Sequence, residues 1–297
     1  MYLNSRSSYY FSSIPLQILK PSTTMISILK ELPVGFIAIF VGILGASVGS
    51  FLNVVIYRIP RNLSLFKPGS HCTHCQTPIR PWHNIPIISY FMLGRRCASC
   101  GAVISMRYPI VETLSVLVSV LAFLRFGWSW STLGGMVLSW HLIALAFIDW
   151  DTMTLPDHIV LPMGIAGILF VWINGGLNGF LLGLISAAIG VGFLLILFLL
   201  GRFVLRREAL GTGDITMTAA FGMYLKPETI VVALFIASLL TLLAAFLWAI
   251  WARQRLRQVE IPFAPALSLG AIIAFFYGME LLPLYFSGMI RGVSLFI

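Results

Sequence analysis

Long apolar runs without a charged side chain constrain this sequence more than any other feature. Several have the roughly 20 residues that a helix needs to cross a bilayer. The run from His158 to Gly201 is long enough for two crossings and is interrupted by Asn174–Gly179. Only 10% of the 297 residues are charged, against about a quarter in soluble domains. The sequence therefore predicts an all-α polytopic membrane protein, surrounded by membrane lipid.

We expect about eight spans, near residues 33–57, 109–126, 133–150, 158–174, 178–201, 214–225, 230–252 and 264–285. The sixth is too short to cross comfortably, and its glycine-rich approach suggests a segment that borders a polar cavity. The expected organisation is an N-terminal extension (1–32), a first helix (33–57), a soluble four-cysteine loop (58–108), a multispan domain (109–285) and a tail (286–297). The extension lacks the apolar core of a signal peptide, and Met25 is an alternative start.

The distribution of positive charge predicts the orientation. Of the 19 Lys and Arg residues, 13 flank the spans on the side of the four-cysteine loop. Positive residues accumulate on the cytoplasmic side of membrane proteins, so this loop is expected in the cytoplasm and both termini outside it. The net charge of +9 is then explained by topology, and we expect no nucleic-acid partner.

All four cysteines of the chain lie in the soluble loop. Cys72 and Cys75 form one C-x2-C pair, and Cys97 and Cys100 form another after 21 intervening residues. Two such pairs suit tetrahedral sulfur coordination of a structural zinc ion. Two disulfides or four ordinary buried thiols are the alternatives, and a cytoplasmic location disfavours stable disulfides. With four thiolates present, His71, His74 and His83 are expected to be bystanders.

Two aspartates occupy positions where charge is costly. Asp149 ends the third span and Asp214 begins the sixth, on the same predicted side of the membrane. Paired carboxylates suit peptide hydrolysis, because one can activate water while the other, protonated, polarises the carbonyl group. Other roles are open: Asp214 as a cap of its own helix, Asp151 as a solvated interfacial group, and Asp157 as a helix N-cap.

Four segments, in this order, resemble the bacterial type IV prepilin peptidase family. They are Gly49–Pro60 with the cysteine loop after it, Ser105–Glu112, Asp149 with Leu155-Pro156-Asp157, and Gly211-Thr212-Gly213-Asp214. The resemblance covers residues 35–285. It implies a G-x-G-D intramembrane aspartic peptidase of the bacterial inner membrane, with Asp149 and Asp214 as the catalytic residues.

The resemblance also implies the substrates and a second activity. These are type IV prepilins or pseudopilins, cleaved after a leader Gly at the cytoplasmic face. The new N-terminal residue, usually Phe, is then methylated with S-adenosylmethionine, an activity associated with the four-cysteine loop. No ordinary binding motif for this donor is readable, so its contacts are unknown. Arg107 and Glu112 are expected to pair with each other or to support the site.

One position departs from the family pattern. Thr216 stands where the family usually has Lys, and an ammonium group there would favour an ionised carboxylate, so we expect activity with an altered pH profile. Two other functions compete with the enzyme. One is a transporter that uses the carboxylates along a water path, and the other is an inactive assembly platform.

Overall fold

The computed structural model describes residues 33–203, 211–252 and 261–293. The predicted extension, 1–32, lies outside these residues. Within them the regular structure is helical, with no strand. The chain divides into two compact units, 1–37 and 38–297, and all the sites discussed below lie in the second. The elements are α2 (Val34–Arg58), η1 (Ile59–Arg61), η2 (Pro81–His83), α3 (Ile88–Met92), α4 (Arg107–Phe126), α5 (Trp130–Thr152), α6 (Asp157–Phe203), α7 (Thr212–Gly222), α8 (Pro227–Ala252) and α9 (Ala264–Val293).

Six of the described helices, namely α2, α4, α5, α6, α8 and α9, are long and apolar enough to cross a membrane. The predicted all-α, multi-pass architecture is therefore confirmed. The 47-residue α6 is broken at Gly176, whose φ of 54° is not helical, and this break lies in the predicted interruption. The 11 residues of α7 span only about 16 Å. The number of crossings stays a prediction, and α9 continues to Val293, beyond the predicted end at 285.

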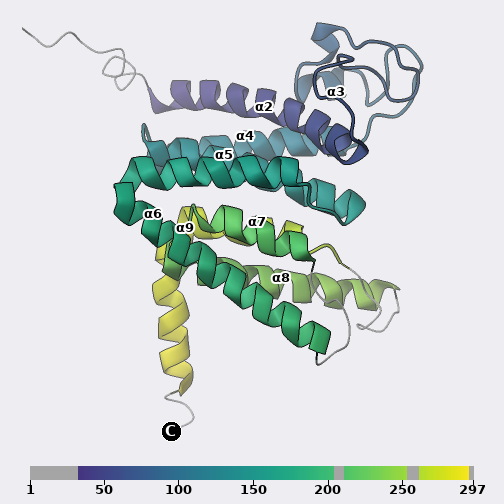
Figure 1. Ribbon diagram of the computed structural model, residues 1–297. Coiled ribbons are helices and arrows are strands. Elements are labelled where there is room, and N and C mark those ends of the chain that lie inside the picture. The colour runs from purple at the N-terminus through teal and green to yellow at the C-terminus, as the bar shows by residue number, and fades with distance from the viewer. Residues whose placement is uncertain (1–32, 204–210, 253–260, 294–297) are drawn as a thin grey trace, which may run out of the picture. The chain divides into compact units, whose positions relative to one another are not determined.

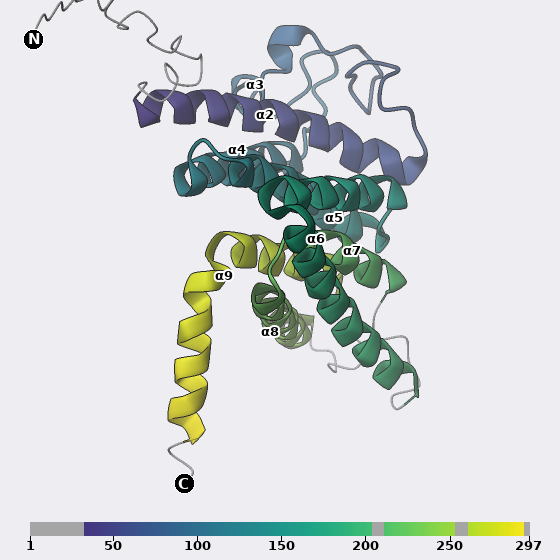
Figure 2. The ribbon, with the colours of Figure 1, turned by 60° about the vertical axis from the view of Figure 1, so that its left-hand side comes forward.

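The helices α2, α4 and α5 lie side by side in that order, with α7 and α9 on the other side of α5 (Figures 1 and 2). α6 packs along α7, and α8 packs along α9. The end of α5 that the sequence predicts to be cytoplasmic therefore lies beside the start of α4 and the start of α7.

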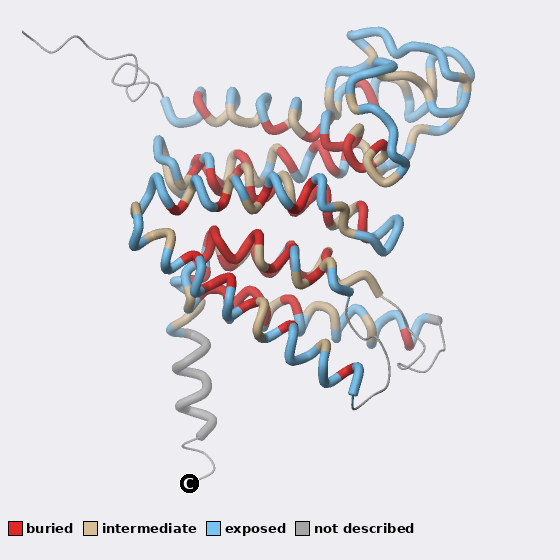
Figure 3. Tube along the Cα trace, viewed as in Figure 1, coloured by how far each residue is buried: buried red, intermediate tan, exposed pale blue. Residues whose placement is uncertain are grey.

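The interior of the second unit is built around α5. Leu138, Leu142, Leu145 and Ile148 are fully buried along one side of this helix, and they share a core with α7, α9 and parts of α2 and α4. Figure 3 shows the buried residues gathered on the facing sides of these helices. The outer faces of α6 and α8 expose large apolar side chains, as expected of helices that face lipid.

Glycines allow two helix pairs to touch at the backbone. A Cβ atom on Gly49 of α2 would lie 2.7 Å from the Cα of Glu112 in α4. A Cβ atom on Gly222 of α7 would lie 2.7 Å from the Cα of Ala187 in α6. Small residues at such crossings are typical of membrane helix packing, where close backbone approach provides the attraction.

The loop after α2 is anchored by a buried arginine. The Arg58 guanidinium donates to the carbonyl oxygens of Ser64 (2.8 Å) and Pro68 (2.7 Å), among others, and is 6% exposed. A buried charge requires such hydrogen bonds to offset its loss of hydration. Arg58, which the sequence analysis counts among the positive residues flanking the first span, therefore also shapes the start of the four-cysteine loop.

Candidate active site and metal centre

Asp149 lies in the last turn of α5, and its side chain is 6% exposed. Its Oδ2 atom accepts a hydrogen bond of 3.1 Å from the backbone N–H of Ala264. Ala264 is the first residue of α9, so this carboxylate faces the N-terminus of a helix, where the dipole and unpaired N–H groups favour negative charge. The contact orients one oxygen of this carboxylate.

Asp214 lies in the first turn of α7 and is 7% exposed. Its Oδ2 atom accepts the N–H of Gly211 at 3.3 Å, so the capping role considered from the sequence is real. The carboxylate also interacts electrostatically with that of Asp149. The fold thus brings together two carboxylates that are 65 residues apart in sequence.

The segments around the two aspartates also pack on each other. A Cβ atom on Gly213 would lie 3.0 Å from the Cβ of Leu155, so the glycine-containing motif rests on the Leu-Pro-Asp segment. Asp157 is exposed and begins α6, close to its predicted N-cap position. Thr216 is exposed, and its hydroxyl donates to the Gly213 carbonyl at 2.9 Å. Because residues i and i+2 of a helix do not face each other, Thr216 does not lie against the Asp214 carboxylate, and the expected change in pH profile stays a prediction.

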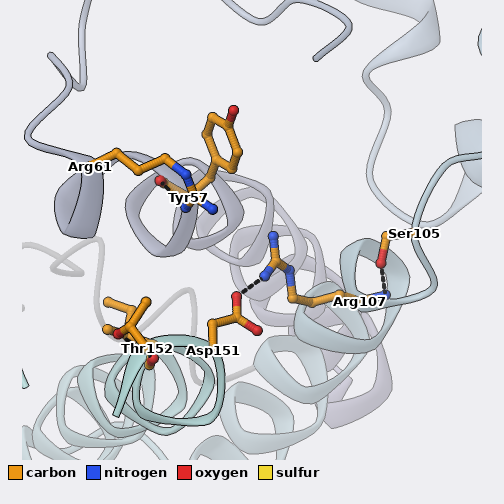
Figure 4. A network of polar contacts seen from close by, with 7 residues as sticks. Tyr57, Arg61, Ser105, Arg107, Asp151 and Thr152 are labelled. Carbon is orange, nitrogen blue, oxygen red and sulfur yellow. Dashed lines mark hydrogen bonds and ion pairs between the residues drawn. The ribbon is translucent and has the colours of Figure 1, made fainter. Parts of the chain in front are cut away.

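One alternative from the sequence, that Asp151 is only a solvated interfacial group, is wrong. It forms an ion pair with Arg107 at the start of α4 (Figure 4). Arg61, the last residue of η1, lies over the ring of Tyr57 in the same region, 4.4 Å from its centroid. The pairing of Arg107 with Glu112 was wrong. Five residues correspond to about 140° around a helix, so the two side chains leave α4 on different faces.

The four cysteines meet, as predicted. The Sγ atoms of Cys72, Cys75, Cys97 and Cys100 all lie within 4.8 Å of one another, and no histidine joins this cluster among the described residues. The group is compatible with zinc, whose structural sites take four thiolate ligands and leave no open position. A structural role then follows from the donor set.

Both cysteine pairs adopt the same backbone turn. In the first, the Cys72 N–H donates to Thr77 O and the Gln76 N–H donates to Cys72 O. In the second, the Cys97 N–H donates to Ala102 O and the Gly101 N–H donates to Cys97 O. The residue after each second cysteine has positive φ, 58° at Gln76 and 71° at Gly101. Equivalent turns present two sulfur atoms each, as a four-sulfur site requires.

The thiols also differ in pKa, and a bound cation would deprotonate all of them. Hydrogen bonds with the side chain and backbone of Thr77 lower the pKa of Cys75 to about 6. A backbone hydrogen bond at Ala102 lowers the pKa of Cys100, but desolvation and the three neighbouring thiols together raise it to about 11. Four adjacent thiols do not all ionise by themselves, and a bound metal cation deprotonates such ligands.

Sequence reasoning missed two contacts of this region. The first is the Ala264 N–H on Asp149, which comes from a helix 115 residues further along the chain; the Pro-Phe-Ala-Pro start of α9 was its only local signal. The second is the N–H of Ile87, which donates to the buried Glu112 carboxylate at 2.6 Å. No local pattern indicates that contact, because it depends on how the loop folds back over α4.

Comparisons with known proteins agree with this geometry. Residues 43–126 match the Bacterial Peptidase A24 N-terminal domain, and residues 136–246 match the Type IV leader peptidase family. A prepilin leader peptidase/N-methyltransferase of Neisseria gonorrhoeae is 37% identical over 257 residues, covering 78% of this chain and 88% of the relative. Another, of Pseudomonas aeruginosa, is 31% identical over 298 residues, covering 88% and 97%. No solved structure matches the chain. From these matches, and from the paired aspartates and the four-cysteine cluster, the chain belongs to the type IV leader peptidase family.

Proposed function

We propose that this protein removes the leader peptide from type IV prepilins or pseudopilins and then N-methylates the new N-terminal residue. The observation that carries the peptidase half is the pair of buried, interacting carboxylates of Asp149 and Asp214. The relatives, named prepilin leader peptidase/N-methyltransferases, support both halves.

In the proposed cleavage, the two carboxylates act as a unit on one water molecule. The ionised carboxylate removes a proton from water while the water oxygen bonds to the scissile carbonyl carbon. The protonated carboxylic acid polarises the carbonyl oxygen. The C–N bond then breaks, and a proton passes to the leaving amine. Because the pair shares its protons, acid and base are not assigned individually. The Ala264 N–H, 3.1 Å from Asp149 Oδ2, would hold that carboxylate in place throughout.

The site would lie at the cytoplasmic face of the bacterial inner membrane. Both aspartates are close to helix ends on the side that carries the excess of Lys and Arg. A prepilin whose apolar helix lies in the bilayer would present the junction with its basic leader at the same depth. The leader would be cut after its final Gly, which leaves a free amine, usually that of Phe, at the membrane boundary.

For the second step, S-adenosylmethionine would supply an electrophilic methyl group. The lone pair of the new amine would bond to that methyl carbon as the S–CH3 bond breaks, S-adenosylhomocysteine would leave, and the methylated amine would lose a proton to solvent. The residues in place to support this chemistry are those of the soluble loop and the adjoining ends of α2 and α4. The four cysteine thiolates would hold zinc and keep that loop folded, away from the peptidase residues.

The test is mass spectrometry of a prepilin coexpressed with the wild-type protein or a variant. Asp149→Asn and Asp214→Asn should each abolish cleavage, because one carboxylate cannot serve as both acid and base. Asp157→Asn is the matched control, since this exposed aspartate begins α6 and Asn caps helices equally well; its product should be cut and heavier by one methyl group. Cleavage by both dyad variants at the wild-type rate would contradict the assignment of these aspartates, whereas uncut prepilin with well-expressed wild-type protein would favour an assembly platform.

A further inference from the structure

A cavity of about 730 Å³ lies between the end of α2, the start of α4 and the four-cysteine loop. Small-molecule sites have volumes of roughly 300–1,000 Å³, so the cavity is large enough for a nucleoside-sized ligand. Asn53 and Tyr57 of α2 and Tyr108 and Glu112 of α4 contribute to its wall, and the loop supplies most of the rest. Neither Asp149 nor Asp214 lines it, so this is a second site.

The helical wall of the cavity holds two buried acceptors. Glu112 is 6% exposed and accepts hydrogen bonds from Ile87 N–H at 2.6 Å and from the side chain of Ser50. Asn53 is 3% exposed, and its amide N–H2 group donates to Tyr108 O at 3.1 Å and Gly49 O at 3.3 Å. The Oδ1 atom of Asn53 has no partner. A buried acceptor without a donor is costly, and Asn53 belongs to the wall of the cavity.

The two acceptors are neighbours across the helix crossing. Gly49 lies against Glu112, and Asn53 bonds Tyr108. Gly49 and Asn53 are one turn apart on α2, as Tyr108 and Glu112 are on α4, so about 5–6 Å along the axes separates Asn53 from Glu112. No Lys or Arg pairs with Glu112 among the described residues. An anionic and a neutral acceptor side by side suit a positively charged ligand group.

The backbone that meets Glu112 is strained. Ile87 has φ 62° and ψ −53°, a conformation that is rare for a β-branched residue. Its N–H is thereby directed at the Glu112 carboxylate. Strain of this kind tends to occur at functional sites. The contact gives Glu112 one fixed orientation at the cavity wall.

The loop side of the cavity has the opposite character. Arg80 lines it and forms no ion pair among the described residues. Its guanidinium lies 5.7 Å from the centroid of the Trp82 ring. A cavity with acceptors on one wall and an unpaired guanidinium on the other complements a ligand that carries both a cationic centre and a carboxylate.

We propose that this cavity binds S-adenosylmethionine, with Glu112 and Asn53 against its positively charged portion and Arg80 towards its carboxylate. The inference rests on the proposed methyltransferase function and gives it a site. Arg107 connects this site to the peptidase, because it lines the cavity and pairs with Asp151, two residues beyond Asp149 (Figure 4).

The direct test is equilibrium binding of radiolabelled S-adenosylmethionine to the purified full-length protein in detergent. Glu112→Gln keeps an acceptor for Ile87 and removes the charge, so affinity should fall about tenfold or more, as expected for loss of a charge-assisted contact. Val54→Trp places a large ring at the cavity wall and should abolish binding without removing a polar group. Glu228→Gln, in the first turn of α8, is the matched control and should bind as the wild type does.

Coexpression with a prepilin distinguishes failure of the proposed donor site from failure of the proposed methyltransferase function. Both cavity variants should lower the ratio of methylated to cleaved product, whereas Glu228→Gln should not. If the wild type methylates but both cavity variants bind the donor normally, this cavity is not the donor site and the proposed function stands. If the wild type cleaves and neither binds the donor nor methylates, the methyltransferase half of the proposed function fails together with this inference. Should Glu112→Gln fail to accumulate, Val54→Trp decides the matter.

Discussion

The contact of α2 with α4 at Gly49 provides the sharpest test of this structure. In Gly49→Ala, the new Cβ atom would lie 2.7 Å from the Cα of Glu112 and 3.0 Å from the Cβ and Oγ atoms of Ser115. Carbon atoms settle at about 3.5–4.0 Å, so the helices must separate by roughly 1 Å. The nearest obstacle is backbone, which has no rotamer to change. We expect a loss of about 1–3 kcal/mol in the free energy of unfolding, typical of overpacking.

Gly42→Ala is the internal control for this change. It lies on the same helix, and its new Cβ atom would lie 3.6 Å from side-chain carbons of Val116 and Val120, an ordinary contact. Both substitutions gain the same helix propensity, so the difference between them isolates the clash. Denaturation in detergent measures that difference, and equal stabilities would refute the close approach of α2 and α4.

Gly49→Ala should also affect the two proposed activities to different extents. Asn53 and Glu112 lie at or within one turn of the crossing, and the Asn53–Tyr108 hydrogen bond spans it. The peptidase residues lie on α5 and α7. Gly49→Ala should therefore reduce methylation of a coexpressed prepilin more than its cleavage. A parallel loss of both activities, at normal protein abundance, would contradict this division.

Three further predictions concern the loop and its junction with the helices. Zinc should be retained at neutral pH and lost to chelators or in acid, because protons compete for the thiolates. Metal analysis across pH checks this, and an absence of metal at pH 8 would contradict it. Gly101→Ala should destabilise the second cysteine turn by about 1 kcal/mol, because φ 71° is unfavourable for a residue with a Cβ atom. The control is Gly69→Ala, at a position with open space and no positive φ. Under limiting chelator, the zinc occupancy of Gly101→Ala should drop below that of this control. A double-mutant cycle with Arg107→Ala and Asp151→Asn should give a coupling of about 0.5–1 kcal/mol, since both side chains are partly exposed, and additive effects would show that the ion pair contributes nothing.

The sequence by itself determined the membrane class, the approximate spans and the gathering of the four cysteines. These properties depend on local or short-range patterns. Uncharged runs of spanning length require a bilayer, and two C-x2-C turns present four thiolates wherever they meet. The sequence also predicts one membrane depth for the two aspartates, because Asp149 and Asp214 both lie at ends of expected spans, and this depth stays a prediction.

Only the tertiary structure decided the partners of the buried polar groups. The Asp149 carboxylate meets the N–H of Ala264 because α9 packs on α5. Arg107 reaches Asp151 rather than Glu112 because helical geometry turns residues five apart onto different faces. Glu112 instead meets Ile87, in a strained conformation that no propensity favours. Such contacts join segments far apart in sequence, and their geometry follows from packing that local patterns do not encode.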